Sequence, residues 1–234
     1  MRVAITGCNR GIGRAVALAL ASEGASLLVH ARRQESLDAI VAEALEAGAS
    51  QVVGVLGDLR DKSLGERMAV AGFETLGGLD AILLSAAILG PMVPVAELER
   101  HALRQALDIG VVAQVDLVRP LLPRFVAQGH GALLWMSSGL GRFGLPGYGA
   151  YAAMKHAVEG LAKVVAEEHR DDGLISLAIA PGLVQTEMLQ AALGTEDVSE
   201  HQTPEETAQG FVRLLRALEP EMNGASLDIG DWLS

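Results

Sequence analysis

The chain has 234 residues and a formal net charge of −11, from 29 acidic and 18 basic residues. This balance argues against nucleic acid and against an anionic membrane surface as partners, because phosphate groups are bound by clustered positive charge. A single cysteine excludes a disulfide within the chain, and no apolar run reaches the roughly 18 residues typical of a membrane span. We therefore expect a cytoplasmic, globular protein.

Short apolar runs alternate with longer amphipathic runs along the chain. In chain order the apolar runs cover residues 2–6, 26–31, 51–58, 79–87, 131–138, 174–182 and 224–230. Strands that are apolar throughout, separated by amphipathic helices, are typical of a parallel sheet covered on both faces. The sequence therefore predicts an α/β fold, a doubly wound parallel sheet of about seven strands with helices on both faces, which is Rossmann-like.

Longer runs with a helical pattern fill the intervals between the predicted strands. They cover residues 13–25, 35–49, 61–77, 97–122 and a stretch around 148–158. No linker, repeat or low-complexity tract interrupts the alternation, which indicates one domain over residues 1–234. Residues 186–204 are the exception, because this segment is polar and irregular at its centre. We expect it to be a mobile loop at the substrate site.

A glycine-rich turn, "TGCNRGIG" at residues 6–13, lies between the first predicted strand and the first predicted helix. Gly7, Gly11 and Gly13 remove side chains where a tight turn brings backbone N–H groups toward a ligand. The helix that follows offers its positive N-terminal end to a pyrophosphate. A plain turn without a ligand is the alternative, but the position at the first strand–helix junction favours dinucleotide binding.

The end of the second predicted strand indicates which dinucleotide is bound. An acidic residue there would bond both ribose hydroxyls, whereas arginine accommodates a 2′-phosphate. The sequence reads "LLVHARRQ", so the acid is missing and Arg32 and Arg33 follow at once, with Arg10 in the glycine turn as a third cation. Guanidinium groups bind phosphate in a bidentate way. Two solvated arginines in a loop are the alternative; the pattern favours NADP(H) over NAD(H).

Tyr151 and Lys155 stand four residues apart in the apolar stretch "YGAYAAMKHAV". Residues at this spacing are neighbours on one face of a helix. A free tyrosine has a pKa near about 10, and a nearby ammonium lowers it toward neutral pH by favouring the phenolate. The pair is either a surface contact of no consequence or an acid–base unit. Together with the nucleotide turn, it favours the acid–base unit.

In this order and spacing, the motifs resemble those of the short-chain dehydrogenase/reductase family, and the resemblance runs from residue 2 to about residue 230. The family's TGxxxGxG turn matches residues 6–13, and its YxxxK matches Tyr151 and Lys155. The serine expected 13 residues before the tyrosine is Ser138. The family's "PG" after the sixth strand is Pro181 and Gly182, with a threonine at residue 186.

The resemblance implies the roles of individual residues. Tyr151 would be the acid and base, Ser138 would bond the reacting oxygen, and Lys155 would also bond the nicotinamide ribose. Asp58 would meet the adenine edge. The implied NADP(H) contacts are Gly7, Asn9, Arg10, Gly11, Ile12, Gly13, Arg32, Arg33, Asp58, Leu59, Ser85, Ala86, Tyr151, Lys155, Pro181, Gly182, Val184 and Thr186.

The chain departs from the family pattern in two places. Where the family usually has Asn-Asn-Ala-Gly, residues 84–87 read Leu-Ser-Ala-Ala. Where the family usually carries an asparagine that holds a water in the proton path to the lysine, this chain has Gly110. A backbone carbonyl, an extra water or Gln114, one turn later, could take over that role. If none of these takes over that role, we expect Gly110 to weaken turnover.

The function implied is that of an NADP(H)-dependent oxidoreductase acting on a carbonyl or secondary alcohol, in a homodimer or homotetramer. Two alternatives stay open. One is a catalytically impaired NADP(H)-binding sensor or scaffold; the other is a sugar-nucleotide epimerase or dehydratase, disfavoured because only residues 183–234 follow the sixth strand. The scattered histidines predict no metal site. Glu187, Glu196 and Asp197 argue against an anionic substrate, and the sequence fixes neither the substrate nor the direction of reaction.

Overall fold

The computed structural model describes residues 1–233, and within them seven parallel strands form one sheet in the order β3-β2-β1-β4-β5-β6-β7. This confirms the predicted fold class. The strands are β1 (Arg2–Thr6), β2 (Ser26–Ala31), β3 (Gln51–Leu56), β4 (Ala81–Leu84), β5 (Gly131–Met136), β6 (Leu174–Ala180) and β7 (Ser226–Asp228). The central strands are buried almost throughout, as expected for a sheet covered on both faces.

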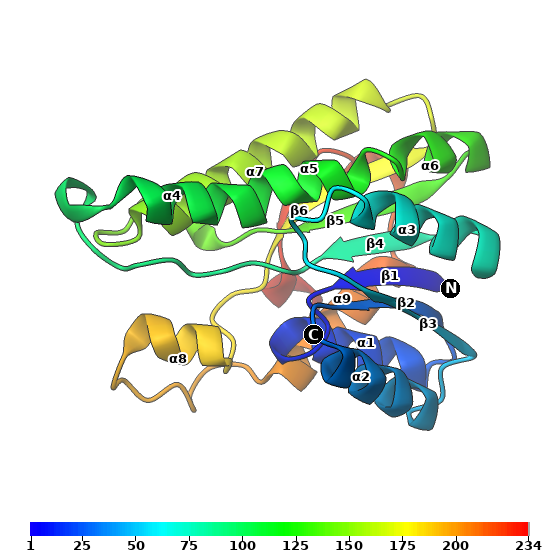
Figure 1. Ribbon diagram of the computed structural model, residues 1–234, viewed down its shortest axis with the longest axis horizontal. Helices are drawn as coiled ribbons and strands as arrows, with labels where there is room; N and C mark the ends of the chain where they lie inside the picture. The colour runs from blue at the N-terminus through cyan, green and yellow to red at the C-terminus, as the bar shows by residue number, and fades with distance from the viewer. Residues whose placement is uncertain (234) are drawn as a thin grey trace.

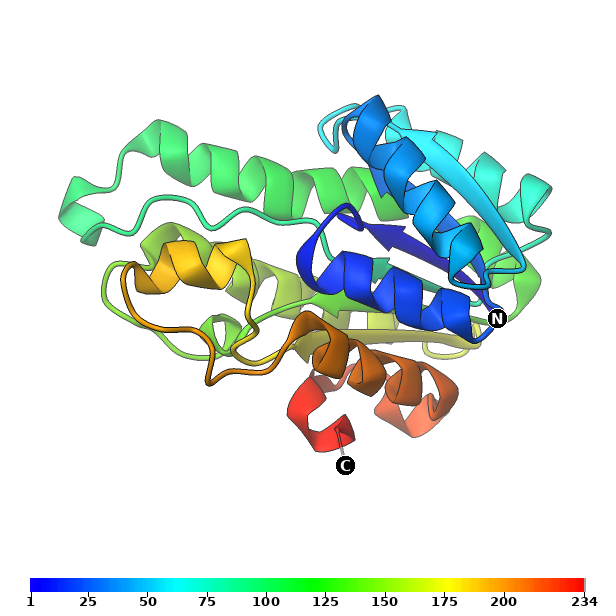
Figure 2. The ribbon, with the colours of Figure 1, turned by 90° about the horizontal axis from the view of Figure 1, so that it is seen from below.

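Helices cover both faces of the sheet, with one apolar core on each side (Figure 1). On one face pack α1 (Gly11–Ser22), α2 (Gln34–Glu46) and α9 (Pro204–Arg216). On the other face pack α3 (Leu64–Val70), α5 (Ala113–Val118), α6 (Leu122–Gln128) and α7 (Gly149–Glu168). Seen from below, α1, α2 and α9 lie together across the first face (Figure 2). Among the described residues no helix combines the length and apolar character needed to cross a bilayer.

The chain order reverses between β1 and β4, which lie side by side at the middle of the sheet. In open α/β sheets, ligands bind outside the carboxyl ends of the strands at such a reversal. The turns after these two strands touch: the Ala86 amide donates to Thr6 Oγ1 at 3.3 Å. A Cβ on Gly7 would lie 2.9 Å from Ala86 Cα, so only glycine fits. The glycine turn is therefore fixed at the ligand-binding edge.

A long helical stretch runs from α4 (Arg100–Leu107) through a π-helical turn, η3 (Asp108–Val112), into α5. Gly110 lies buried inside this π-helical turn. Such turns are rare and are often found at functional sites. The family asparagine would therefore fall at a local break in the regular helix.

The segment 186–204 contains a short helix, α8 (Glu187–Leu193), which the sequence pattern did not predict. Thr186 caps it, because its side chain accepts a hydrogen bond from the Leu189 amide at 3.2 Å. The rest of the segment, up to the start of α9, has little regular structure. Its mobility stays a prediction.

Candidate active site

The glycine turn has the backbone that its sequence predicts. Gly7 and Gly11 have φ values of 69° and 55°, a region that other residues rarely adopt. A Cβ on Gly13 would lie 2.5 Å from the Gly7 carbonyl oxygen, so the turn can close only over a glycine. The first turn of α1 carries no acidic residue. The positive end of the helix therefore remains free to attract a phosphate.

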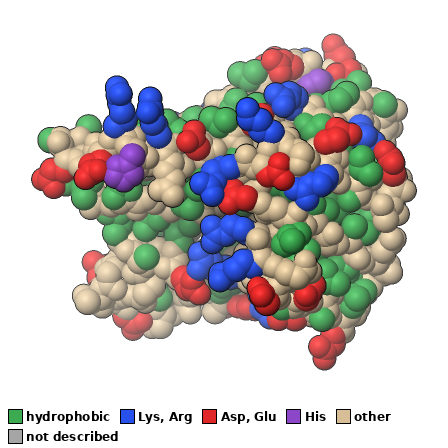
Figure 3. Space-filling view, viewed as in Figure 1, with side chains coloured by type: hydrophobic (Ala, Val, Ile, Leu, Met, Phe, Trp, Pro, Cys, Tyr) green, Lys and Arg blue, Asp and Glu red, His purple; other side chains and the backbone are tan. Residues whose placement is uncertain are grey.

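Four arginines lie at the edge of the sheet where the adenosine part of the cofactor is expected. Arg10, Arg32, Arg33 and Arg60 are all exposed and follow β1, β2 and β3, whose carboxyl ends share one edge of the sheet. A group of basic side chains gathers near the middle of the face shown in Figure 3. The chain is acidic as a whole. Because Arg10 and Arg60 pair with carboxylates, Arg32 and Arg33 carry the positive charge that fits a phosphate better than a bare ribose hydroxyl.

The carboxylate of Asp58, at the end of β3, is held by Arg60. Arg60 Nε donates to Oδ1 and Nη2 to Oδ2, each at 2.9 Å. The hydrogen bonds from Arg60, with a contribution from the charge of Arg32, hold the pKa of Asp58 far below its usual range. Arg60 was missing from the sequence-based site, although its position two residues after Asp58 was a usable signal. The contact of Asp58 with an adenine stays a prediction.

Ser138, Tyr151 and Lys155 come together at the carboxyl edge of the sheet, the same edge that carries the glycine turn. Ser138 follows β5 and caps a short 3-10 turn, η4 (Gly139–Gly141), by accepting from the Leu140 amide at 3.2 Å. Tyr151 and Lys155 lie one turn apart on α7, with the ammonium nitrogen 5.5 Å from the centre of the tyrosine ring. The phenol and the ammonium therefore face the same site.

Lys155 is deeply buried, with an exposed fraction of 2%. Its Nζ donates to the Met136 carbonyl oxygen at 2.6 Å. Burial lowers the pKa of Lys155 to about 8, because the charged form loses its hydration. The ammonium is thus anchored to the end of β5 and is destabilised by its surroundings.

The pKa of Tyr151 is raised, which is opposite to the direction expected from the sequence. Burial of the phenol raises it, and the neighbouring Ser138 hydroxyl acts in the opposite direction without overcoming burial. The ammonium of Lys155 makes its hydrogen bond to a backbone carbonyl. In the protein alone, the tyrosine is therefore held as a neutral acid.

Met154 fills the space beside Gly110. A Cβ on Gly110 would overlap the sulfur and Cγ of Met154, which is completely buried on α7. No side chain larger than hydrogen fits at residue 110 without displacing this methionine. The place of the family asparagine is therefore apolar here, and sequence comparison alone could not reveal which residue fills it.

Gln114 takes a different position from the missing asparagine. It is buried, and its Nε2 donates to the Ala86 carbonyl oxygen at 3.3 Å, in the stretch that departs from Asn-Asn-Ala-Gly. Among the described residues its Oε1 has no hydrogen-bond partner. The glutamine thus supports the backbone next to Gly7. Its role as a stand-in in proton transfer stays a prediction.

The helix α8 lies over the nucleotide edge. Glu187 forms an ion pair with Arg10 of the glycine turn, and Gly11 packs against Thr186, where an added Cβ would be 3.3 Å from Cγ2. The far end of α8 is held by Tyr148, whose hydroxyl donates to the Ala192 carbonyl oxygen at 3.0 Å. The predicted contacts around Thr186 therefore lie beside the glycine turn.

A hollow opens between the part of the molecule that carries α4 and the part that carries α8, and hydrophobic side chains lie on its walls (Figure 3). The loops after β4, β5 and β6 each expose large apolar side chains. These are Met92, Val95, Phe143, Leu145 and Leu183. Within residues 1–233, no cluster of three or more His, Cys, Asp or Glu could hold a metal ion.

Comparison with known proteins agrees with this geometry. The family model described as "short chain dehydrogenase" matches residues 1–197. The NADPH-dependent pterin aldehyde reductase of Arabidopsis thaliana is 31% identical over 97% of this chain and 92% of its own length. The crystal structure of levodione reductase matches with a TM-score of 0.90 at 27% identity, covering 100% and 98% of the two chains. A short chain dehydrogenase from Shigella flexneri complexed with NADP matches with a TM-score of 0.89 at 29% identity, covering 98% and 96%.

Proposed function

The chain belongs to the short-chain dehydrogenase/reductase family of oxidoreductases, and on that premise we propose that it transfers hydride between NADP(H) and a carbonyl or secondary-alcohol substrate. The observation that carries the proposal is the meeting of Ser138, Tyr151 and Lys155 at the edge of the sheet that holds the glycine turn. A structural protein has no need of a buried ammonium beside a phenol, because burying a charge is costly.

In the proposed reaction each residue of the site has a separate role. Bound NADP(H) supplies or accepts the hydride. During reduction, Tyr151 donates its proton to the substrate's carbonyl oxygen, and Ser138 donates a hydrogen bond to the same oxygen as negative charge develops there. During oxidation, Tyr151 takes the proton from the alcohol. Its raised pKa favours the neutral phenol, which is the form that donates the proton. The positive charge of Lys155 stabilises the phenolate that remains after proton donation.

The preference for NADP(H) is supported by the arginines at the end of β2. Arg32 and Arg33 stand where an acid would select NAD(H), and Arg10 lies across the turn. The relative from Arabidopsis is named for its NADPH dependence, and the similar Shigella protein is complexed with NADP. Gly7, Gly11 and Gly13 would seat the pyrophosphate at the start of α1.

The substrate we propose is uncharged and carries a bulky apolar group. Phe143 and Val95 are 58% and 75% exposed in loops next to the site, and Phe143 packs against Gly139, directly after Ser138. Exposed apolar side chains gathered at one concave site indicate a binding surface. Glu196 and Asp197 would repel an anion, whereas the charge of Glu187 is offset by its ion pair with Arg10.

A panel of carbonyl compounds tests the proposal. Benzaldehyde, cyclohexanone and phenanthrenequinone would be incubated with the protein and either NADPH or NADH, and nucleotide oxidation followed by absorbance. We expect turnover with NADPH to exceed turnover with NADH, and benzaldehyde to exceed carboxybenzaldehyde, its anionic counterpart. Absence of turnover with every compound, despite NADPH binding, would contradict the oxidoreductase assignment.

A catalytically impaired NADP(H)-binding sensor is the second candidate. The apolar contact between Gly110 and Met154 favours it, because no polar side chain supports proton transfer at that point. A single-turnover experiment separates the two candidates: an enzyme oxidises bound NADPH on mixing with a carbonyl compound, whereas a sensor only binds it. We also propose a cytoplasmic homo-oligomer, joined through the stretch from η3 to α5, which exposes Val112 and Val115, and through α7, which exposes Val164.

A further inference from the structure

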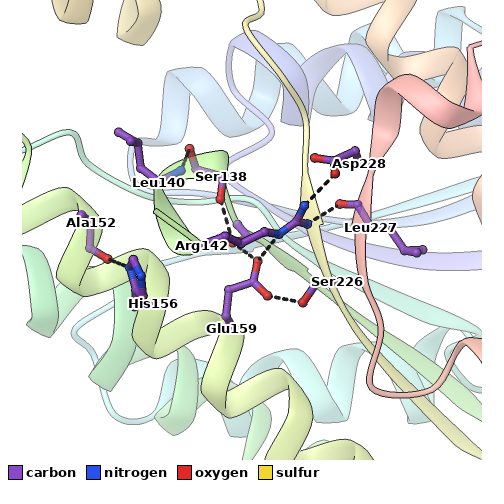
Figure 4. Close-up of polar contacts among 10 residues, drawn as sticks. Ser138, Leu140, Arg142, Ala152, His156, Glu159, Ser226, Leu227 and Asp228 are labelled. Atoms are coloured by element: carbon purple, nitrogen blue, oxygen red, sulfur yellow. Dashed lines mark hydrogen bonds and ion pairs between the residues drawn. The ribbon is translucent and has the colours of Figure 1, made fainter. Parts of the chain in front are cut away.

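We infer that Glu159 is a positioning residue for Ser138: its buried carboxylate fastens both ends of the segment that carries the serine to the helix that carries Tyr151 and Lys155. The inference rests on the proposed function, since it concerns the same site. Figure 4 shows the group of contacts around Glu159.

One end of the serine segment is held through Ser137. This side chain is buried at the end of β5, and its Oγ donates to Glu159 Oε1 at 2.6 Å. The Ser137 amide also donates to the Ile179 carbonyl oxygen at 2.7 Å, so the residue is fixed to β6 on its other side. The residue immediately before Ser138 therefore cannot shift without breaking a charge-assisted hydrogen bond.

The other end of the segment is held through Arg142. Its Nε donates to the same Oε1 of Glu159 at 3.3 Å, and its Nη1 pairs with Asp228 Oδ2 at 2.6 Å. Its Nη2 donates to the Leu227 carbonyl oxygen at 2.9 Å. Arg142 thus links η4 to both α7 and β7 (Figure 4). A single carboxylate oxygen receives hydrogen bonds from residues 137 and 142, which flank the serine and η4.

Between Ser137 and Arg142 the segment is packed closely against α7. A Cβ on Gly141 would lie 2.7 Å from Ser137 Oγ and 3.0 Å from the Lys155 carbonyl oxygen, so η4 rests directly on α7. The other carboxylate oxygen of Glu159 accepts from the Ser226 hydroxyl. Every contact of the carboxylate thus ties a separate strand or turn to α7.

Glu159 lies on the same face of α7 as the two proposed catalytic residues of that helix. It lies one turn beyond Lys155 and two turns beyond Tyr151, so all three belong to one face of the helix. Fixing the 137–142 segment to Glu159 therefore fixes the Ser138 hydroxyl relative to the phenol. Burying a carboxylate is costly and contributes little net stability even when it is paired, so geometric control is the better explanation for its presence.

A double-mutant cycle tests the inference. Glu159→Gln, Ser138→Ala and the double variant would be assayed with NADPH and the carbonyl compound that the wild-type protein reduces fastest. We expect Glu159→Gln to lower kcat at least about tenfold, because small displacements of reacting groups are costly, with NADPH affinity unchanged within about twofold. In the Ser138→Ala background the same change should have almost no effect on kcat.

Glu167→Gln is the matched control, because Glu167 lies on the same helix and pairs with Arg170 at the surface. It should retain wild-type kcat. An equal loss of kcat from Glu159→Gln with and without Ser138 would overturn the inference, as would an unchanged kcat in the Glu159→Gln variant. Thermal unfolding would establish that each variant is folded.

Hydrogen–deuterium exchange provides a measurement that does not need turnover. We expect Glu159→Gln to accelerate exchange at the backbone amides of residues 138–142, and Glu167→Gln to leave it unchanged. If the wild-type protein reduces no carbonyl compound, the proposed function fails. The exchange measurement still tests whether Glu159 fixes the segment that carries Ser138. Unchanged exchange at residues 138–142 would overturn the inference in either case.

Discussion

Met154 and Gly110 occupy one space: the methionine side chain, completely buried on α7, lies where a side chain on residue 110 would have to go. The two residues come from different helical stretches, one from η3 and one directly before Lys155. The absence of the asparagine usual in this family is therefore not an isolated loss. It is matched by a larger apolar residue on the facing helix.

Gly110→Asn is expected to destabilise the protein by about 2 kcal/mol, because overpacking a buried site forces the neighbours out of position. Met154→Ser should cost about 3 kcal/mol through the loss of buried apolar surface. Combined, the two changes should cost at least about 1 kcal/mol less than their sum, since the serine makes room for the asparagine. Urea unfolding of the three variants measures the coupling.

Gly160→Asn is the control for this cycle. Gly160 lies on α7, and a Cβ there would meet nothing within 4 Å. Its substitution should change the free energy of unfolding by less than about 0.5 kcal/mol. Strictly additive costs for Gly110→Asn and Met154→Ser would show that the two positions do not compete for space.

Replacing Arg32 should change the preference between cofactors. Arg32→Asp removes a cation next to the expected 2′-phosphate and introduces the acid that suits a ribose hydroxyl. We expect the ratio of kcat/KM with NADPH to that with NADH to fall by tenfold to about a hundredfold, the range for one charged hydrogen bond. Arg119→Asp, a surface change at the carboxyl end of α5, should leave the ratio unaltered. An unchanged ratio in Arg32→Asp would contradict the phosphate assignment.

Burial of Lys155 predicts a dependence of stability on pH. Its pKa is lowered to about 8 in the folded protein from 10.5, so between these values the unfolded chain binds a proton that the folded protein has released. Stability from this group therefore rises with pH across that window, by up to about 3 kcal/mol. Lys155→Met should remove this rise, which urea unfolding at about pH 8 and pH 10 would detect.

Other buried groups also make the free energy of unfolding depend on pH, and comparing wild type with Lys155→Met removes their contribution. Burial raises the pKa of Cys8 to about 11 from 9.0, which lowers stability with rising pH in both proteins. The difference in unfolding free energy between wild type and Lys155→Met therefore isolates the lysine. A difference that stays constant across this pH range would show that the ammonium is not desolvated.

The sequence predicted the fold and the principal motifs because both depend on local patterns. The alternation of apolar strands and helices predicted the sheet, and the spacing of Tyr151 and Lys155 predicted that they lie one turn apart on a helix, as they do; their catalytic role stays a prediction. What could not be predicted depends on packing between distant segments. Met154 beside Gly110 is one example, and the link from Glu159 to Arg142 is another.

The direction of the pKa shift of Tyr151 is a further example. From the sequence, the charge of Lys155 was expected to lower this pKa, but burial raises it, and the opposing influence comes from the Ser138 hydroxyl. Spacing along a helix places two groups on one face without giving the depth at which they lie. The helix α8 was missed for a related reason, because it has only seven residues and only Leu189 among them is buried, which is too little for a helical pattern to show in the sequence.

Tyr151→Phe tests the central claim most directly, with Tyr148→Phe as a matched control on the other tyrosine of the chain. Each variant would be loaded with NADPH and mixed with the best carbonyl compound of the panel, and the rate of the first turnover measured by stopped flow. We predict that Tyr151→Phe binds NADPH normally and loses turnover by at least about a hundredfold, the contribution of a positioned acid, while Tyr148→Phe stays within a few fold of wild type. A first-turnover rate of Tyr151→Phe close to that of the wild-type protein would contradict the account.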